Sequence, residues 1–194
     1  MERKILWAGL LILTALVTGA VLFSIYGQKE FKGVEISPAP LAPEFSGLTT
    51  RDGSSVRLEA YKGKTVLLFF GYTNCPDVCP TTLARLKQVE ASLAEKSNDV
   101  AVIMVTTDPL RDTAERLKSY LANFNPSFIG VTGQPTDLAA AWANYGVSVL
   151  DDGTTHSARV YVIDPKGRLR MTFPAEMTPE DMVSDLLLLM SEEQ

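Results

Sequence analysis

The chain has 194 residues, of which 46% are hydrophobic and 21% are charged, and its formal net charge at pH 7 is −5. A chain of this length and apolar content can fold around one core and still carry an accessory segment. Because the phosphate backbone selects for surfaces rich in lysine and arginine, the acidic balance argues against a nucleic-acid partner.

A run without charged residues covers positions 5–26, after a short N-terminus at residues 1–4. An α-helix over this run would be about 33 Å long, enough to cross a hydrocarbon core of about 30 Å. A cleaved signal peptide would have a shorter apolar region that ends in small residues, whereas Thr18, Gly19 and Ala20 lie inside the run. We therefore expect residues 5–26 to be a transmembrane anchor.

The flanks of this run suggest an orientation. Arg3 and Lys4 precede it, so the positive-inside rule places residues 1–4 in the cytoplasm and the rest of the chain outside it, where thiols can be oxidised. Residues 27–43 are polar and then rich in proline, which is typical of a semi-extended linker before a domain at 44–194. The short N-terminus lacks an arginine-rich transit segment, which favours a single-pass protein of a bacterial inner membrane with a periplasmic domain. The alternative is the mitochondrial inner membrane, with the domain facing the intermembrane space.

Segments typical of strands and helices alternate through the expected domain. A small hairpin is expected at 46–58, strands at 65–70, 100–106, 128–131, 158–163 and 168–173, and helices starting near Pro80, Thr113, Thr136 and Thr178. The run at 65–70 is apolar on both faces, which indicates a central strand. The order predicts an α/β sandwich, a central mixed β-sheet flanked by helices, with its ligand-binding edge at the C-terminal ends of the strands.

Both cysteines of the chain, Cys75 and Cys79, lie between the first of these strands and the helix expected from Pro80. The partial positive charge of a helix N-terminus favours thiolates, the form of cysteine that binds metals and reacts in redox chemistry. A structural disulfide is a weak alternative, because a bridge that closes so short a loop removes little chain entropy. We therefore predict a functional site with two sulfur atoms.

His156 is the one histidine in the chain and follows the polar hairpin tip Asp151-Asp152-Gly153. A lone histidine on a surface loop usually has no role, but a loop entering a strand of this sheet can approach the active edge. Two thiolates and one imidazole suit Cu(I) and can also hold Cu(II), whereas a structural zinc site would need a fourth ligand. The residues favour copper binding and leave redox chemistry open.

Three segments, at 66–80 with the word C-P-D-V-C-P, at 107–113 and at 156–167, closely resemble the Sco/SenC family of membrane-anchored, thioredoxin-like copper proteins. The resemblance implies a thioredoxin-like fold and one copper ion per chain, Cu(I) or Cu(II), held by Cys75, Cys79 and His156. It also implies delivery of copper to the dinuclear copper site of cytochrome c oxidase subunit II, or to another copper protein. We expect the soluble domain to be a monomer.

Two other functions stay open. Some family members resemble thiol-disulfide reductases, so the protein could reduce the cysteines of that copper site or act in redox signalling, with Cys75 and Cys79 as the catalytic pair. Ordinary thioredoxin-like reductases, however, have C-x-x-C and a proline before the strand matching 158–163, where this chain has His156. A purely structural assembly factor is the other alternative. Asp77 and Asp108 are candidates for groups that tune the thiols or hydrogen-bond the histidine, although either carboxylate could simply begin a helix.

Overall fold

The computed structural model describes residues 12–18, 30–50, 52–150, 155–156 and 159–192. The chain divides into two compact units, Met1–Glu30 and Phe31–Gln194. In the first unit, residues 12–18 are helical, and the rest of the anchor expected at 5–26 lies outside the described residues. Within the described residues, no helix is both long and apolar enough to cross a membrane.

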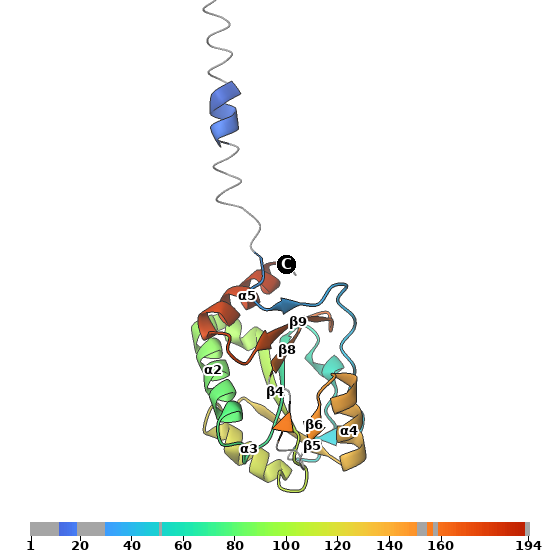
Figure 1. The fold of residues 1–194 in the computed structure, drawn as a ribbon. Helices are drawn as coiled ribbons and strands as arrows, with labels where there is room; N and C mark the ends of the chain where they lie inside the picture. The colour runs from blue at the N-terminus through green and yellow to red at the C-terminus, as the bar shows by residue number, and fades with distance from the viewer. Residues whose placement is uncertain (1–11, 19–29, 51, 151–154, 157–158, 193–194) are drawn as a thin grey trace, which may run out of the picture. The chain divides into compact units, whose positions relative to one another are not determined.

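The second unit is built on a seven-stranded mixed sheet with the strand order β1-β9-β8-β3-β4-β5-β2 (Figure 1). Strands β3, β4 and β5 are parallel to one another, and β8 is antiparallel to both of its neighbours, β3 and β9. A separate two-stranded ladder pairs β6 with β7. The strands are β1 (Val34–Glu35), β2 (Leu48–Thr49), β3 (Thr65–Gly71), β4 (Val100–Thr106), β5 (Ile129–Gly133), β6 (Val149–Leu150), β7 (Thr155–His156), β8 (Arg159–Ile163) and β9 (Leu169–Pro174).

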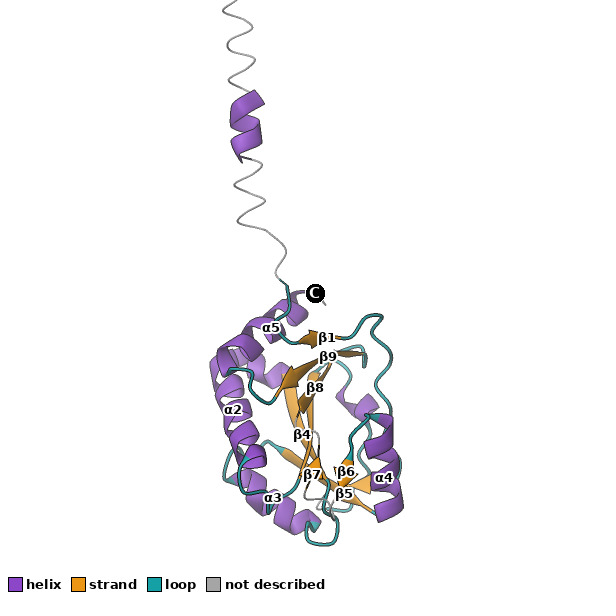
Figure 2. Ribbon diagram, viewed as in Figure 1, coloured by secondary structure: helices purple, strands orange, loops and turns teal. Residues whose placement is uncertain are grey.

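Helices cover both faces of this sheet (Figure 2). The α-helices are α2 (Val78–Leu93), α3 (Ala114–Ala122), α4 (Pro135–Asn144) and α5 (Pro179–Glu192), and the 3-10 segments are η1 (Leu58–Tyr61) and η2 (Ala94–Asp99). Apolar residues of α2, α3 and α5 form one core cluster with Leu67 and Phe69 of β3. Residues of α4 and η1 form the other cluster with Leu68 and Phe70. The predicted α/β sandwich with a mixed sheet is confirmed.

Two helix starts differ from those expected. Helix α2 begins at Val78, so Pro80, expected as its first residue, lies within the first turn. Helix α4 begins at Pro135 with Gln134 as its N-cap, so Thr136, expected as the cap, is already helical. Proline is well suited to the first helical position because the N–H that it lacks would have no partner in the helix. In α4 this backbone effect decides the start, although threonine is the better capping residue.

The first residues of the second unit are packed into its fold and do not form a free linker. Strand β1 pairs with β9, and the backbone N–H groups of Lys32 and Gly33 donate to the carboxylate of Asp185 on α5 at 2.8–3.0 Å. Much of the linker expected at 27–43 is therefore part of the compact unit, which starts at Phe31. Proline-rich composition did not reveal this docking, because prolines are also tolerated at sheet edges.

Asp185 provides a test of this docking. Its side chain is buried, so Asp185→Ala would leave the N–H groups of Lys32 and Gly33 without their charged acceptor. We expect the free energy of unfolding to fall by about 2–3 kcal/mol in urea titrations. The control is Asp181→Ala on the same helix, which removes an exposed ion pair with Lys32 and is expected to cost clearly less, because water screens an exposed pair. Equal losses in the two variants would contradict the prediction.

Candidate functional site

The two cysteines lie where β3 leads into α2, at the C-terminal edge of the parallel strands. The N–H of Cys75 donates to the carbonyl of Tyr72 at 3.4 Å, which forms a tight turn after the strand. Cys79 lies in the first turn of α2, and its N–H donates to the sulfur of Cys75 at 3.4 Å. The N-cap residue Asp77 makes no side-chain capping bond to the helix backbone. The Cys75 sulfur therefore accepts one of the N–H groups that a helix start leaves without an intrahelical partner.

The two free thiols have different environments. Burial raises the pKa of the Cys79 thiol well above its usual value, because the side chain is 0% exposed. Burial also opposes ionisation of Cys75, but hydrogen bonds from the N–H groups of Cys79 and Asp77 outweigh it and lower the pKa of Cys75. The expectation that the helix start favours thiolates therefore holds for Cys75 and not for Cys79.

Gly71 makes room for the buried sulfur. A Cβ atom at this position would lie 2.9 Å from the sulfur of Cys79 and 2.6 Å from a ring carbon of Phe69. Real side chains do not tolerate such contacts, so any larger residue would displace the thiol or the ring. Gly71 directly follows the apolar run expected as a strand at 65–70, and a glycine directly before a cysteine loop is the signal in the sequence that could have identified its role.

Two tyrosines lie behind the sulfur atoms. Burial, and after it the charge of Cys75 and a hydrogen bond with it, raises the pKa of Tyr72, so its hydroxyl remains a protonated donor to the thiolate. Burial together with the nearby cysteine charges raises the pKa of Tyr120 to about 12. Tyr120 packs edge to face against Phe124, with their ring centroids 5.4 Å apart. The side chains behind the cysteines are therefore largely aromatic.

The loop between β4 and α3 brings two buried carboxylates to the same edge. Asp108, a candidate from the sequence, has 1% exposure, and the guanidinium of Arg111 binds one of its oxygens at 2.5 Å. Its other oxygen, Oδ1, is buried and has no hydrogen-bond partner among the described residues. Asp112, which the sequence analysis did not single out, is 0% exposed and binds Thr73 in the cysteine loop. Asp77, the other candidate, is exposed and accepts a bond from Thr81 at 3.4 Å.

His156 lies in β7, and its backbone is paired with Val149. Three positions further along, Arg159 begins β8, whose next residue pairs with Phe69 near the end of β3. Because three residues span at most about 11 Å, the Cα atom of His156 lies within that distance of the Cα atom of Arg159, where β8 begins beside the C-terminal end of β3. The side chain of His156 is outside the described part of the structure. Among the side chains that are described, no three His, Cys, Asp or Glu residues are grouped to hold a metal ion.

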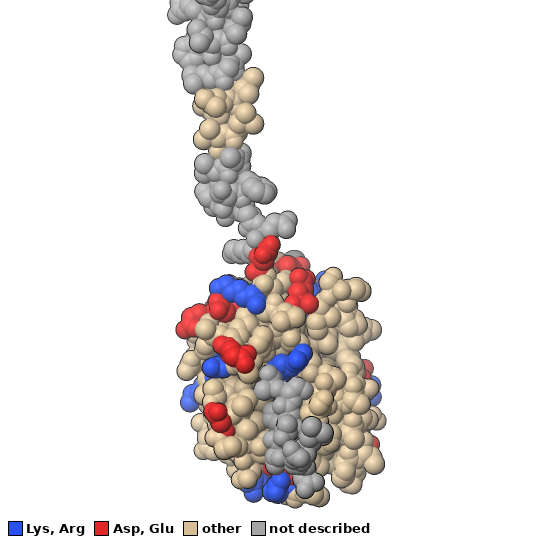
Figure 3. Space-filling model, viewed as in Figure 1, with Lys and Arg blue, Asp and Glu red and all other residues tan. Residues whose placement is uncertain are grey.

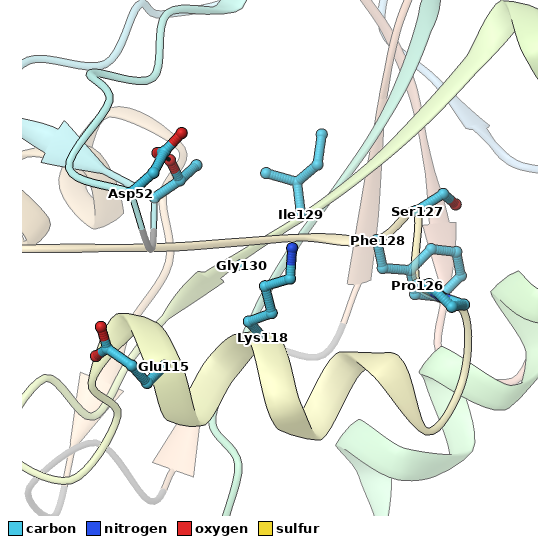
Figure 4. Close-up of a pocket in the computed structure, with 9 residues that line it drawn as sticks. Asp52, Glu115, Lys118, Pro126, Ser127, Phe128, Ile129 and Gly130 are labelled. Carbon is cyan, nitrogen blue, oxygen red and sulfur yellow. Dashed lines mark hydrogen bonds between the residues drawn. The ribbon is translucent and has the colours of Figure 1, made fainter.

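A pocket of about 570 Å³ lies elsewhere, between α3, β5 and the turn after β2 (Figure 4). Figure 4 shows Lys118 extending from α3 toward the strand that carries Ile129. Neither cysteine lines this pocket, and the carboxylate of Asp52 at its rim already accepts bonds from Thr50 and Ser54. On the face shown in Figure 3, acidic and basic side chains are interspersed, so that face offers no field of one sign to steer a partner. The cysteine edge therefore remains the candidate site.

Known proteins share this fold and these segments. The family model described as SCO1/SenC matches residues 34–191. The SCO2-like protein of Rickettsia conorii is 32% identical over 148 residues, which cover 72% of this chain and 72% of that protein. The solution structure of apo Sco1 from Thermus thermophilus has a TM-score of 0.74 and 34% identity, and covers 84% of this chain and 99% of that chain. ScoI of Bradyrhizobium japonicum, solved with copper bound, has a TM-score of 0.70 and 35% identity, and covers 77% of this chain and 99% of that chain.

The matched segment includes the whole seven-stranded sheet and the loop that carries both cysteines. The resemblance inferred from the three sequence segments is confirmed. The chain therefore belongs to the SCO1/SenC family.

Proposed function

We propose that this protein binds one copper ion per chain through Cys75, Cys79 and His156 and delivers it to the dinuclear copper site of cytochrome c oxidase subunit II or to another copper protein. The observation that carries the proposal is that two free thiols lie close together at the start of α2, where the backbone N–H of Cys79 donates to the Cys75 sulfur at 3.4 Å. Support also comes from the copper-bound ScoI of Bradyrhizobium japonicum, at 35% identity. The delivery step is inferred from the family resemblance.

The different burial of the two sulfurs suits a carrier that must release its cargo. Cys79 is enclosed by the core, whereas Cys75 is partly exposed and lies in a loop that a partner can reach. A thiol must lose its proton to bind a metal ion, so binding releases the proton that the raised pKa holds on Cys79. We infer that an incoming thiol of the partner displaces Cys75 and His156 from the copper ion first, and that Cys79 is the last ligand to dissociate from it.

We infer that residues 5–26 anchor the domain in a bacterial inner membrane, with residues 1–4 in the cytoplasm and the cysteine site in the periplasm. The support is the uncharged run in the sequence and the basic residues before it. The mitochondrial inner membrane, with the site in the intermembrane space, is the alternative. In either compartment, a monomeric domain that begins at Phe31 would leave few residues between the anchor and the fold.

A thiol-disulfide oxidoreductase is a second candidate, and the unequal cysteines favour it. Enzymes of this kind attack with an exposed thiolate and resolve the mixed disulfide with a second thiol. Cys75, with its lowered pKa, has the properties of the attacking residue, and buried Cys79 has those of the resolving one. In such a reaction the two protein thiols would become a disulfide while the substrate disulfide is reduced to two thiols.

Copper titration of the full-length reduced chain in detergent tests the first proposal. We expect one Cu(I) per chain, measured by competition with a colorimetric chelator, and loss of tight binding in Cys75→Ser and Cys79→Ser. His156→Ala should weaken binding by at least about tenfold while the count of free thiols stays the same, because it removes one ligand of three. Thr155→Ala, in the same strand, is the control and should bind like the wild type. Absence of copper uptake by the reduced chain would refute the proposal.

Alkylation of the reduced chain tests the inequality of the two thiols. At pH 7 we expect iodoacetamide to modify Cys75 at least about tenfold faster than Cys79, because thiolate fraction and access both favour Cys75. Both cysteines lie on the tryptic peptide 65–85, so fragmentation of that peptide by tandem mass spectrometry locates the modified residue, and Cys75→Ser should leave a slowly reacting chain. Equal rates at the two positions would show that the buried thiol is not protected. That result would remove the observation that favours the oxidoreductase.

A further inference from the structure

Asp112 is a buried carboxylate placed beneath the loop that carries Cys75. Its Oδ2 accepts the backbone N–H of Thr73 at 3.0 Å and the hydroxyl of Thr106 at 2.8 Å, and its Oδ1 accepts the hydroxyl of Thr73 at 2.6 Å. The guanidinium of Arg116 closes the group, because its Nε lies 3.9 Å from Oδ1 and donates to the Thr73 hydroxyl at 2.7 Å. The carboxylate therefore joins the cysteine loop to the end of β4 and the first turn of α3.

This network sets how far Cys75 can move relative to Cys79. Cys79 is enclosed in the core at the start of α2, so its position follows from helix packing. Cys75 lies in the loop between β3 and α2. Two residues earlier, the backbone N–H and the hydroxyl of Thr73 both donate to the carboxylate of Asp112. The strand itself is held at Gly71, whose carbonyl accepts the N–H of Thr107 at 2.9 Å. Between that point and the helix, Asp112 binds the loop through both the N–H and the hydroxyl of Thr73, and Arg116 adds a bond to the same hydroxyl.

We propose that Asp112 is a positioning residue for the cysteine pair: its carboxylate holds Thr73, and through it the Cys75 loop, so that the two sulfurs stay within bonding reach of each other. The proposal rests on the cysteine pair being the working site, as proposed above. It concerns the thiols in the absence of copper, so it can fail while copper binding stands. The plainer alternative is that Asp112 contributes only to the stability of the fold.

Asp164 offers a matched control for that alternative. It is also buried, and its carboxylate accepts the backbone N–H groups of Lys166 and Arg168 and the guanidinium of Arg168 at 2.7–3.0 Å. Among the described contacts, each of the two aspartates accepts three hydrogen bonds and pairs with an arginine four positions further along the chain, and Asp164 also lies 3.8 Å from the guanidinium of Arg170. Asp164 lies in the turn between β8 and β9, at the opposite end of the sheet from the cysteines. Any effect seen for Asp112 and not for Asp164 is therefore specific to the cysteine edge.

The experiment compares Asp112→Asn and Asp164→Asn in the full-length chain, equilibrated in mixtures of reduced and oxidised glutathione. In this reaction the two protein thiols form a disulfide, and one oxidised glutathione becomes two reduced molecules. Thiols held side by side form a disulfide more readily. We expect Asp112→Asn to shift the equilibrium about tenfold toward the dithiol, which is about 30 mV. Asp164→Asn should match the wild type, and urea unfolding should show similar losses of stability for both variants.

A double-mutant cycle then tests whether Asp112 acts through Thr73. Thr73→Val removes the hydroxyl that Asp112 and Arg116 share, and should shift the same equilibrium in the same direction by a smaller factor. Combined with Asp112→Asn it should add less than its separate effect, because both changes break one network. If Asp112→Asn does not fold, the thiol equilibrium of Thr73→Val tests the proposal by itself, because this variant removes one side-chain hydroxyl and leaves the buried carboxylate in place. A wild-type thiol equilibrium in Thr73→Val, or in a folded Asp112→Asn, would overturn the proposal.

Discussion

Strand β3 is buried along all seven of its residues, and the rest of the domain is arranged by that constraint. A strand buried on both faces must have neighbours at both edges and helices over both faces, which the mixed sheet and the two core clusters supply. Its parallel pairing with β4 brings the ends of both strands to one edge. The cysteine loop and the Asp108–Asp112 loop therefore meet because of backbone pairing, and not because either loop selects the other.

The sequence allowed the fold and the cysteine pair to be predicted because both depend on local patterns. The apolar run at 65–70 and the proline-bounded C-P-D-V-C-P word are sufficient to predict a central strand that leads into a helix. Helix α2 begins at Val78, earlier than the start expected near Pro80. At this helix start the Cys75 sulfur accepts a backbone N–H, and sulfur is not among the acceptors that the usual N-cap preferences include. Membership of the family was equally visible, since three separate segments carried the resemblance.

The environment of the site could not be predicted in the same way. The roles of Asp112 and Gly71 depend on distances across the sheet, between residues that lie far apart in the chain or on opposite sides of a turn. The unequal acidity of Cys75 and Cys79 depends on burial and on hydrogen bonds to the sulfurs, which closeness to a helix start in the sequence does not reveal. His156 remains a proposed ligand, since its side chain lies outside the described part of the structure.

The attachment of β1 also has a mechanical consequence. A force applied to the chain at Phe31 would reach Lys32 and Gly33 first, and from there α5 through Asp185 and β9 through the pairing of β1 with β9. Two strands, β9 and β8, lie between β1 and β3, so three strand spacings separate β1 from β3, a lateral distance of about 14 Å. A force from the N-terminal side would therefore act on the edge of the sheet formed by β1 and β9. The cysteine loop follows the central strand β3 and lies away from that border.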